Sequence, residues 1–160
     1  MFKFGDYIAL PWHGAGVIES IVTKKINGSQ RDYYVLKLPV GDMVVMVPVS
    51  GCENIGVRSI ISRSEAEKLF SAFSEIEISM TQNWNKRYRE NMDKIKSGNL
   101  LDVASVVKGL MCRDSERGLS TGERKMLHSA KQILISELVI ATNMDYDGVE
   151  KRLCAALEER

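Results

Sequence analysis

The residues best suited to chemistry surround Trp84, in the most basic stretch of the chain. Three cations follow this tryptophan, Lys86, Arg87 and Arg89. Cations can bind the phosphates of DNA, and a large flat apolar side chain can wedge between base steps in a minor groove. We therefore expect these cations to set the register on DNA and Trp84 to act as the wedge. Lys125, farther along the chain, is expected to add a phosphate contact.

The same segment also fits a buried helix. Trp84, Tyr88 and Met92 are spaced four residues apart, so they share a helix face that could pack into a core. A tryptophan at this spacing is more often a core residue, so burial stays an open alternative. Asn83 is a helix-capping residue, which would place Trp84 in the first turn, beside backbone N–H groups that favour a phosphate. A wedge costs about a few kcal/mol per unstacked base step, so it is easiest where DNA is already opening.

The sequence indicates no catalytic centre. An enzyme would need a nucleophile beside a base, paired carboxylates or a phosphate-binding loop. The glycines of residues 14–16 lack the third glycine of a dinucleotide-binding loop and lead into a strand instead of a helix. Cys52, Cys112 and Cys154 are far apart, and neither histidine stands at ligand spacing from them. We therefore expect no enzyme activity, no cofactor, no metal site and no disulfide.

The composition limits how such a protein could bind DNA. The chain has 160 residues, of which 44% are hydrophobic and 27% charged, and its formal net charge is +1. Tight unaided binding needs many neutralised phosphates, so this charge argues against a general nucleic-acid binder. Any DNA contact must be local and must be helped by another partner. No apolar run could span a bilayer and the first residues do not resemble a signal peptide, so we expect a cytoplasmic monomer.

Strands and turns are expected from about residue 4 to residue 61, where Val, Ile and Tyr alternate with Gly, Pro and Asn. The expected strands are residues 7–10, 16–25, 31–38 and 43–47. Asn27 and Gly28 are typical of a tight hairpin turn, and residues 39–42 should reverse the chain again. So many reversals indicate a small SH3-like or Tudor-like β-barrel, because closure removes exposed sheet edges.

Helices are expected after Ser62, because apolar residues recur there at helical spacing. Capping signals predict about five helices, and they stand at Ser64, Asn83, Asn99, Ser120 and Asp147. The expected fold class is therefore α+β. A small β-barrel domain should occupy residues 1–60, and a compact all-α domain should occupy residues 61–160.

A series of short motifs runs through the whole chain. The motifs are Phe4-Gly5-Asp6, Pro11-x-His13-Gly14-Ala15, Tyr34-Val35-Leu36-Lys37, Val47-Pro48, Asn83-Trp84, Arg87-Tyr88, Ser97-Gly98, Arg113-Asp114-x-Glu116-Arg117-Gly118-Leu119-Ser120 and Gly122-Glu123. In order and spacing they resemble the CarD/CdnL regulators of bacteria. The N-terminal module of this family is similar to the RNA-polymerase-interacting domain of transcription-repair coupling factors. Each motif alone is weak, but chance similarity across so many is improbable.

The resemblance implies a Tudor-like domain that binds the β subunit of RNA polymerase, followed by a helical domain that contacts promoter DNA at the upstream edge of the transcription bubble. Such proteins modulate the stability of the open complex and recognise the shape and backbone of DNA. The family's tryptophan matches Trp84. Relatives dock on polymerase through basic residues on two strands; Lys24 matches the first position, but Met46 stands at the second. A methionine there could provide adaptable apolar contact, or the docking surface could have shifted.

Two functions from different classes stay open on the sequence alone. One is a regulator tethered to polymerase, which should bind bare DNA weakly and promoter DNA clearly when polymerase is present. The other is a protein–protein adaptor that docks on polymerase or another partner, keeps Trp84 in its core and has no effect on DNA. The exposure of Trp84 is the feature that separates them.

Overall fold

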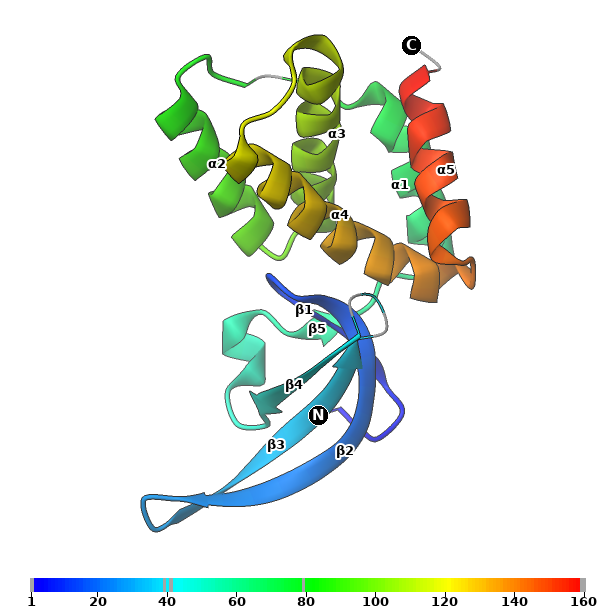
Figure 1. Cartoon of the computed structure of the whole chain (residues 1–160). Coiled ribbons are helices and arrows are strands. Elements are labelled where there is room, and N and C mark those ends of the chain that lie inside the picture. The colour runs from blue at the N-terminus through cyan, green and yellow to red at the C-terminus, as the bar shows by residue number, and fades with distance from the viewer. Residues whose placement is uncertain (1, 39, 41, 79, 159–160) are drawn as a thin grey trace.

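Residues 2–38, 40, 42–78 and 80–158 are described by the structure, a computed structural model in which a sheet and a group of helices lie at opposite ends (Figure 1). The strands are β1 (Tyr7–Leu10), β2 (Gly14–Ile26), β3 (Ser29–Leu38), β4 (Met43–Pro48) and β5 (Arg58–Ser59), with a short 3-10 helix, η1 (Cys52–Ile55), before β5. The helices are α1 (Arg63–Glu75), α2 (Trp84–Lys96), α3 (Leu100–Arg117), α4 (Thr121–Thr142) and α5 (Tyr146–Glu158). The α+β class is confirmed. The turn expected at residues 39–42 includes positions 39 and 41, which lie outside the described residues.

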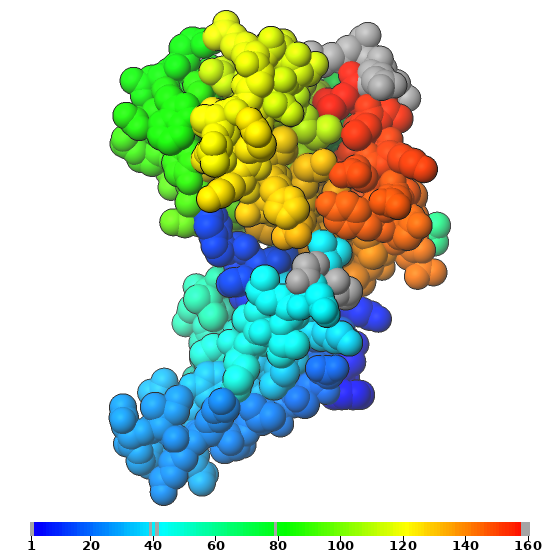
Figure 2. Space-filling view, viewed as in Figure 1, coloured from blue at the N-terminus to red at the C-terminus, as the bar shows by residue number. Residues whose placement is uncertain are grey.

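The strands form one antiparallel sheet in the order β4-β3-β2-β1-β5. β2 and β3 make a long hairpin whose turn residues, Asn27 (φ 51°) and Gly28 (φ 80°), both adopt the left-handed conformation. Such a turn matches the twist of the strands, and asparagine and glycine adopt it at low cost. A register shift between Ile18 and Ser20 marks a β-bulge in β2. The end of the hairpin projects away from the helices (Figures 1 and 2).

One side of the sheet buries a hydrophobic core. Every second residue near the end of β3, namely Tyr34, Leu36 and Leu38, is at most 1% exposed, as the two-residue period of a strand requires. These side chains pack with Ile8 of β1 and Ile18 of β2 in a single cluster. The opposite side of β3 is left for contact with solvent or with a partner.

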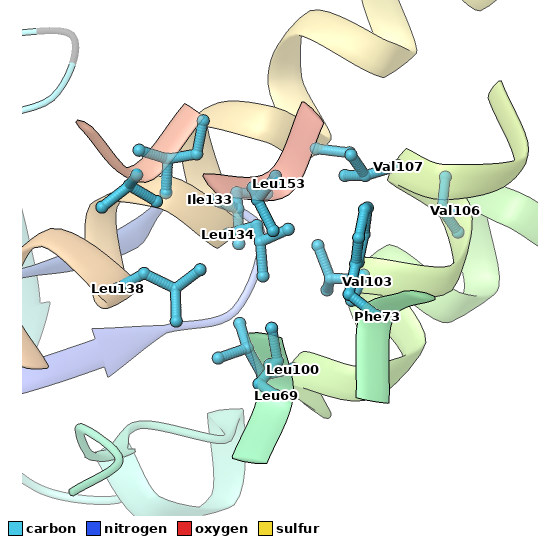
Figure 3. Packing of buried hydrophobic residues seen from close by; sticks show 14 of the residues in the cluster. Leu69, Phe73, Leu100, Val103, Val106, Val107, Ile133, Leu134, Leu138 and Leu153 are labelled. Carbon is cyan, nitrogen blue, oxygen red and sulfur yellow. The ribbon is translucent and has the colours of Figure 1, made fainter. Parts of the chain in front are cut away.

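A second cluster forms the core of the helical half. Figure 3 shows Phe73 of α1, Val107 of α3, Leu134 of α4 and Leu153 of α5 within this cluster. Lys108 is only 1% exposed, and its Nζ donates hydrogen bonds to two backbone carbonyl groups at the C-terminal end of α1. None of the helices in the described part of the chain is long and apolar enough to cross a membrane. The two clusters fall on either side of the boundary expected near residue 60, which stays a prediction.

Two helix starts differ from the prediction. Ser62, not Ser64, caps α1: its Oγ accepts from the backbone N–H of Glu65, and the Glu65 carboxylate accepts from the backbone N–H of Ser62. At α5, the Oδ1 of Asp145 accepts from the backbone N–H of Gly148 at 2.8 Å, so Asp147 lies inside the first turn. In both places two residues that can cap a helix lie two positions apart, and the helix begins after the first of them.

The sheet and the helices meet where α4 packs beside the start of β2. The backbone N–H of Ala15 donates to the Oγ of Ser136 at 2.9 Å. Gly14 lies so close that an added Cβ would come within 2.6 Å of that oxygen. Nearby, the guanidinium of Arg58 in β5 donates two hydrogen bonds, of 2.7 and 2.9 Å, to the carboxylate of Glu137 in α4. A hydrogen bond and a bidentate ion pair therefore join the two halves.

Candidate functional site

Trp84 is the first residue of α2, and part of its indole faces solvent. The helix starts there because the Oδ1 of Asn83 accepts a hydrogen bond from the backbone N–H of Lys86 at 2.9 Å. Trp84 is 42% exposed, whereas Tyr88 and Met92 pack partly against the helical core. The sequence left open whether Trp84, Tyr88 and Met92 are all buried. In the structure Tyr88 and Met92 are partly buried, and Trp84 is exposed.

Three neighbours hold the indole of Trp84. Its ring stacks on the ring of Tyr88, with centroids 5.1 Å apart and planes at 18°. Its Nε1–H donates a hydrogen bond to the Oγ of Ser120, 3.1 Å away. A Cβ added to Gly122 would lie 3.5 Å from Cζ2 of Trp84, so the first turn of α4 touches the ring edge. The indole is exposed and ordered at once, which lowers the entropy cost of presenting it to a partner.

Arg87 does not face solvent, and the sequence-based prediction of a phosphate contact for this residue is wrong. Its side chain is 2% exposed, and its Nε and Nη2 donate to the carboxylate of Glu123 at 2.8 and 3.1 Å. Its Nη1 donates to the backbone oxygens of Thr81 and Gln82. Three residues after Trp84, Arg87 lies on the inner side of α2, where its role is to hold α2 against α4.

The charges of this buried pair stabilise each other. Hydrogen bonding from Arg87 lowers the pKa of Glu123 below its ordinary value of 4.5, against the opposing effect of burial. The same contact raises the pKa of Arg87. Arg113 of α3 lies 4.0 Å from the Glu123 carboxylate and adds further positive charge. The pair therefore stays ionised at neutral pH and joins the N-terminal ends of α2 and α4.

The other three cations predicted to contact DNA, Lys86, Arg89 and Lys125, are exposed. Lys86 and Arg89 lie in the first two turns of α2. Lys125 follows Gly122 by three residues on α4, so it shares the helix face that touches the Trp84 ring. Two helix N-termini also meet here, and their partial positive charge favours anions. The arrangement suits phosphate binding, and the role of each cation stays a prediction.

A second candidate surface is the side of the sheet opposite its core. The pairing register places Lys24 of β2 beside Arg31 of β3, and Met46 of β4 beside Val35 of β3. Arg31 and Val35 are four residues apart on one strand, so these side chains emerge on the same face. Val44, two residues before Met46, joins them and is 62% exposed. We call these five residues the outer face; it has cations toward the hairpin tip and apolar groups toward β4.

Sequence reasoning missed part of both surfaces. It predicts Ser120 only as a helix cap, and the Oγ of Ser120 does accept from the backbone N–H of Glu123. No sequence signal indicates that Ser120 also contacts Trp84, because the two lie 36 residues apart and meet only through packing of helices. Arg31 and Val44 could have been found from strand alternation, once the pairing of the three strands was known.

The described residues give no indication of a metal site or of a disulfide. No three of their His, Cys, Asp and Glu side chains are grouped so that they could hold a metal ion. Cys52, Cys112 and Cys154 are free thiols, and Cys52 is buried. The surfaces around Trp84 and on the outer face are therefore the candidates that carry the functional argument.

Comparison with known proteins agrees with the two-part fold. Residues 2–61 match the family model of the CarD-like/TRCF RID domain, and residues 68–154 match that of the CarD C-terminal domain. The chain is also 36% identical over 140 residues to a Bacillus subtilis (strain 168) protein described as "Putative transcription factor YdeB", covering 88% of this chain and 92% of that relative. Both matched domains occur here in order, and the chain therefore belongs to the CarD-like family of transcription regulators that associate with RNA polymerase.

Proposed function

We propose that this protein docks on the β subunit of RNA polymerase through its outer face and contacts promoter DNA with Trp84 at the upstream edge of the transcription bubble. In doing so it changes the stability of the open complex. The observation that carries this proposal is the indole of Trp84, which is held by Ser120 and Tyr88 and keeps exposed apolar surface available to a partner.

The composition of the outer face supports a role in docking. Exposed apolar side chains, Val44 and Met46, lie beside the cations Lys24 and Arg31. Such a surface can bury apolar area against a partner while charges at its margin orient the encounter. Met46 would supply adaptable apolar contact, whereas a relative with a basic residue at this position would form an ion pair. β4 is also an edge strand of the sheet, so its backbone can pair with an extended segment of the partner.

The surroundings of Trp84 support a contact with DNA that is opening. The indole can stack on an unpaired or partly unstacked base, while Lys86, Arg89 and Lys125 reach nearby phosphates. None of these groups specifies a base sequence, so recognition would depend on the shape and the melted state of the DNA. We expect weak affinity for bare duplex, because few phosphates are neutralised.

The junction between the halves supports the coupling of docking to DNA contact. The Arg58–Glu137 ion pair and the hydrogen bond from Ala15 to Ser136 hold α4 against the sheet. A protein docked on polymerase would therefore keep Trp84 near one region of the promoter at high effective concentration. If it binds the open complex more tightly than the closed one by about 1–3 kcal/mol, the ratio of open to closed complexes rises about 5- to 150-fold.

The test is the lifetime of a polymerase–promoter open complex without protein, with the intact protein and with Trp84→Ala. We expect the intact protein to alter the lifetime and the variant to lose this effect while still binding polymerase. Leu101→Ala is the matched control, because Leu101 is a 51% exposed apolar residue in the first turn of α3, behind its own asparagine cap.

Two results would count against the proposal. Tight binding of bare duplex by the protein alone would make tethering unnecessary. An unchanged lifetime with intact protein, despite demonstrated binding to polymerase, would favour the protein–protein adaptor function.

A further inference from the structure

We propose that Ser120 is a positioning residue for Trp84: its hydroxyl fixes the indole in the one orientation that is presented to DNA. This inference rests on the proposed DNA contact of Trp84. It adds that the contact depends on a residue of another helix, 36 positions away along the chain.

The hydroxyl of Ser120 is itself held firmly. Ser120 is the N-cap of α4, and its Oγ accepts from the backbone N–H of Glu123 at 3.2 Å. The same oxygen accepts from the indole Nε1–H of Trp84 at 3.1 Å, and it lies 3.5 Å from a carboxylate oxygen of Glu123, to which it can donate. Donor and acceptor capacity are both used, so the hydroxyl has little freedom to rotate away.

The two helix ends that bring Ser120 to Trp84 are also fixed. Arg87, three residues after Trp84, and Glu123, three residues after Ser120, form the bidentate ion pair between α2 and α4. Both side chains are at most 3% exposed. The hydrogen bond at the surface is thus placed by a buried contact one turn farther along each helix.

The remaining neighbours leave one side of the indole open. Tyr88 covers one ring face, and Gly122 contacts the ring edge near Cζ2. Ser120 holds the pyrrole edge through Nε1. With the stack on Tyr88 alone, the ring could slide and rotate in its own plane, because stacking has little directionality. The hydrogen bond from Nε1 to Ser120 prevents this rotation.

Positioning should change the strength of the DNA contact without changing docking. Ordering a mobile side chain on binding costs free energy equivalent to a factor of about 2 to 12 in affinity. Without the Ser120 hydroxyl, this cost would fall on the step in which Trp84 engages DNA. The outer face, on the other half of the molecule, would bind polymerase as before.

The experiment compares Ser120→Ala, Ser120→Gly and Ser120→Thr in two assays. Glycine lacks the hydroxyl but is a better N-cap than alanine, so it keeps the test valid where Ser120→Ala folds poorly; threonine retains both cap and hydroxyl. Ser62→Ala is the matched control, because it removes a serine cap of the same kind from α1, where the Ser62 hydroxyl bonds to the backbone N–H of Glu65. Folding of each variant is verified by thermal denaturation.

The first assay reports the indole itself. The chain has two tryptophans, so a Trp12→Phe background leaves Trp84 as the only tryptophan, which can be excited at wavelengths that tyrosine does not absorb. We expect Ser120→Ala and Ser120→Gly to increase the fast local component of the Trp84 anisotropy decay and its quenching by acrylamide. Ser120→Thr should restore both signals, and Ser62→Ala should leave both unchanged. An unchanged signal in the alanine and glycine variants would overturn the proposal.

The second assay uses the open complex and chains that keep Trp12. At saturating protein, we expect the change in lifetime to be about 2- to 12-fold smaller with Ser120→Ala or Ser120→Gly, with unchanged affinity for polymerase free of DNA. A full effect in these variants, when Trp84→Ala abolishes it, would overturn the proposal. If Trp84→Ala itself has no effect, the proposed function fails, and the fluorescence assay alone decides whether Ser120 orders the indole.

Discussion

The buried ion pair of Arg87 and Glu123 helps to position the exposed residue Trp84. Ion pairs removed from water contribute little net stability compared with apolar packing, because the cost of desolvation offsets their attraction. Their geometry is nevertheless well defined, since a guanidinium and a carboxylate align two hydrogen bonds in a plane. Here that geometry sets the spacing between the ends of α2 and α4, and with it the relation of Trp84 to Ser120.

We expect Glu123→Gln to lower the free energy of unfolding by roughly 3–5 kcal/mol near neutral pH, because it leaves the charge of Arg87 buried without its partner. The pKa of Glu123 is lower in the folded protein than its ordinary value of 4.5, so the pair stabilises above that pH. Its contribution is lost as the pH falls through the folded pKa. Urea denaturation of both proteins between about pH 7 and about pH 3 should show their difference shrinking below about pH 4.5.

The control for this prediction is Glu67→Gln. Glu67 pairs with Arg152 at a similar distance, 2.8 Å, but the two side chains are 47% and 39% exposed. Surface ion pairs contribute little, so this variant should stay close to the unmodified protein near neutral pH. A difference between Glu123→Gln and the unmodified protein that stays constant at all pH values would contradict the role assigned to the Glu123 charge.

At the scale of residues, the sequence is a good guide to which side chains have suitable chemistry. It is a poorer guide to which of these side chains face solvent. Trp84 and its cap Asn83 follow from local pattern, because both depend on neighbours within one helical turn. The burial of Arg87 could not be predicted, since its partner Glu123 belongs to a helix 36 residues away. A cation next to an aromatic residue has the same local pattern whether it binds phosphate or a buried carboxylate.

At the scale of elements, the outer face proposed for docking lies on a long hairpin and on the edge strand beside it. β2 and β3 continue past the core of the sheet, so their ends project from the molecule (Figure 1). Apolar Val44 and Met46 lie on the adjoining edge strand, β4. A partner that covers β4 would therefore reach the cations Lys24 and Arg31 with the same approach.

We expect Met46→Asp to weaken binding to RNA polymerase by about 10-fold or more, since it places a desolvated charge in an apolar contact. Met46 is 37% exposed, so the substitution should leave the fold intact. Binding to polymerase without DNA is the measurement, and circular dichroism verifies folding. Leu101→Asp introduces the same charge at an exposed site of the helical half and should leave polymerase binding unchanged. Equal binding by both variants would remove the outer face from the docking surface.

Most elements could be predicted from the sequence, and the errors fall at their starts. The four longer strands follow from alternation and from turn residues such as Asn27 and Gly28, whose conformational preference is local. β5 was not predicted, because a strand of two residues has no period and exists only through its pairing with β1. The capping patterns predict Ser64 and Asp147 where the structure uses Ser62 and Asp145, because neighbouring capping residues cannot be ranked without the backbone.

At the scale of the whole molecule, the junction would determine whether the proposed docking and the proposed DNA contact act together. Glu137 is 2% exposed and accepts hydrogen bonds both from Arg58 and from the backbone N–H of Ile61 at 2.8 Å. Ala15 and Ser136 meet 121 residues apart along the chain. Such contacts cannot be predicted from local pattern, and for this reason the sequence indicated two modules but not how they are joined.

We expect Glu137→Ala to loosen the junction, because Arg58 and the N–H of Ile61 lose their common acceptor. Affinity for DNA-free polymerase should not change, while the effect on open-complex lifetime should fall at least about fivefold as the effective concentration of Trp84 at the promoter drops. The distribution of distances between spin labels on β3 and α5 should also become broader in this variant. Glu150→Ala, which breaks an ion pair with Lys131 inside the helical half, is the control. A narrow distance distribution in Glu137→Ala would contradict this account.

The close approach between Gly14 and α4 limits which sheet and which helices can be combined in one chain. An added Cβ would meet Ser136, and the backbone φ of 103° also disfavours any side chain, so this glycine and α4 are matched to each other. Arg58 and Glu137 are matched in the same way. A recombinant that joins the sheet of one family member to the helices of another would function only where both partners in each match arrive together. We therefore expect an exchange of halves to be tolerated best between donors that share these positions, although each half has a core of its own.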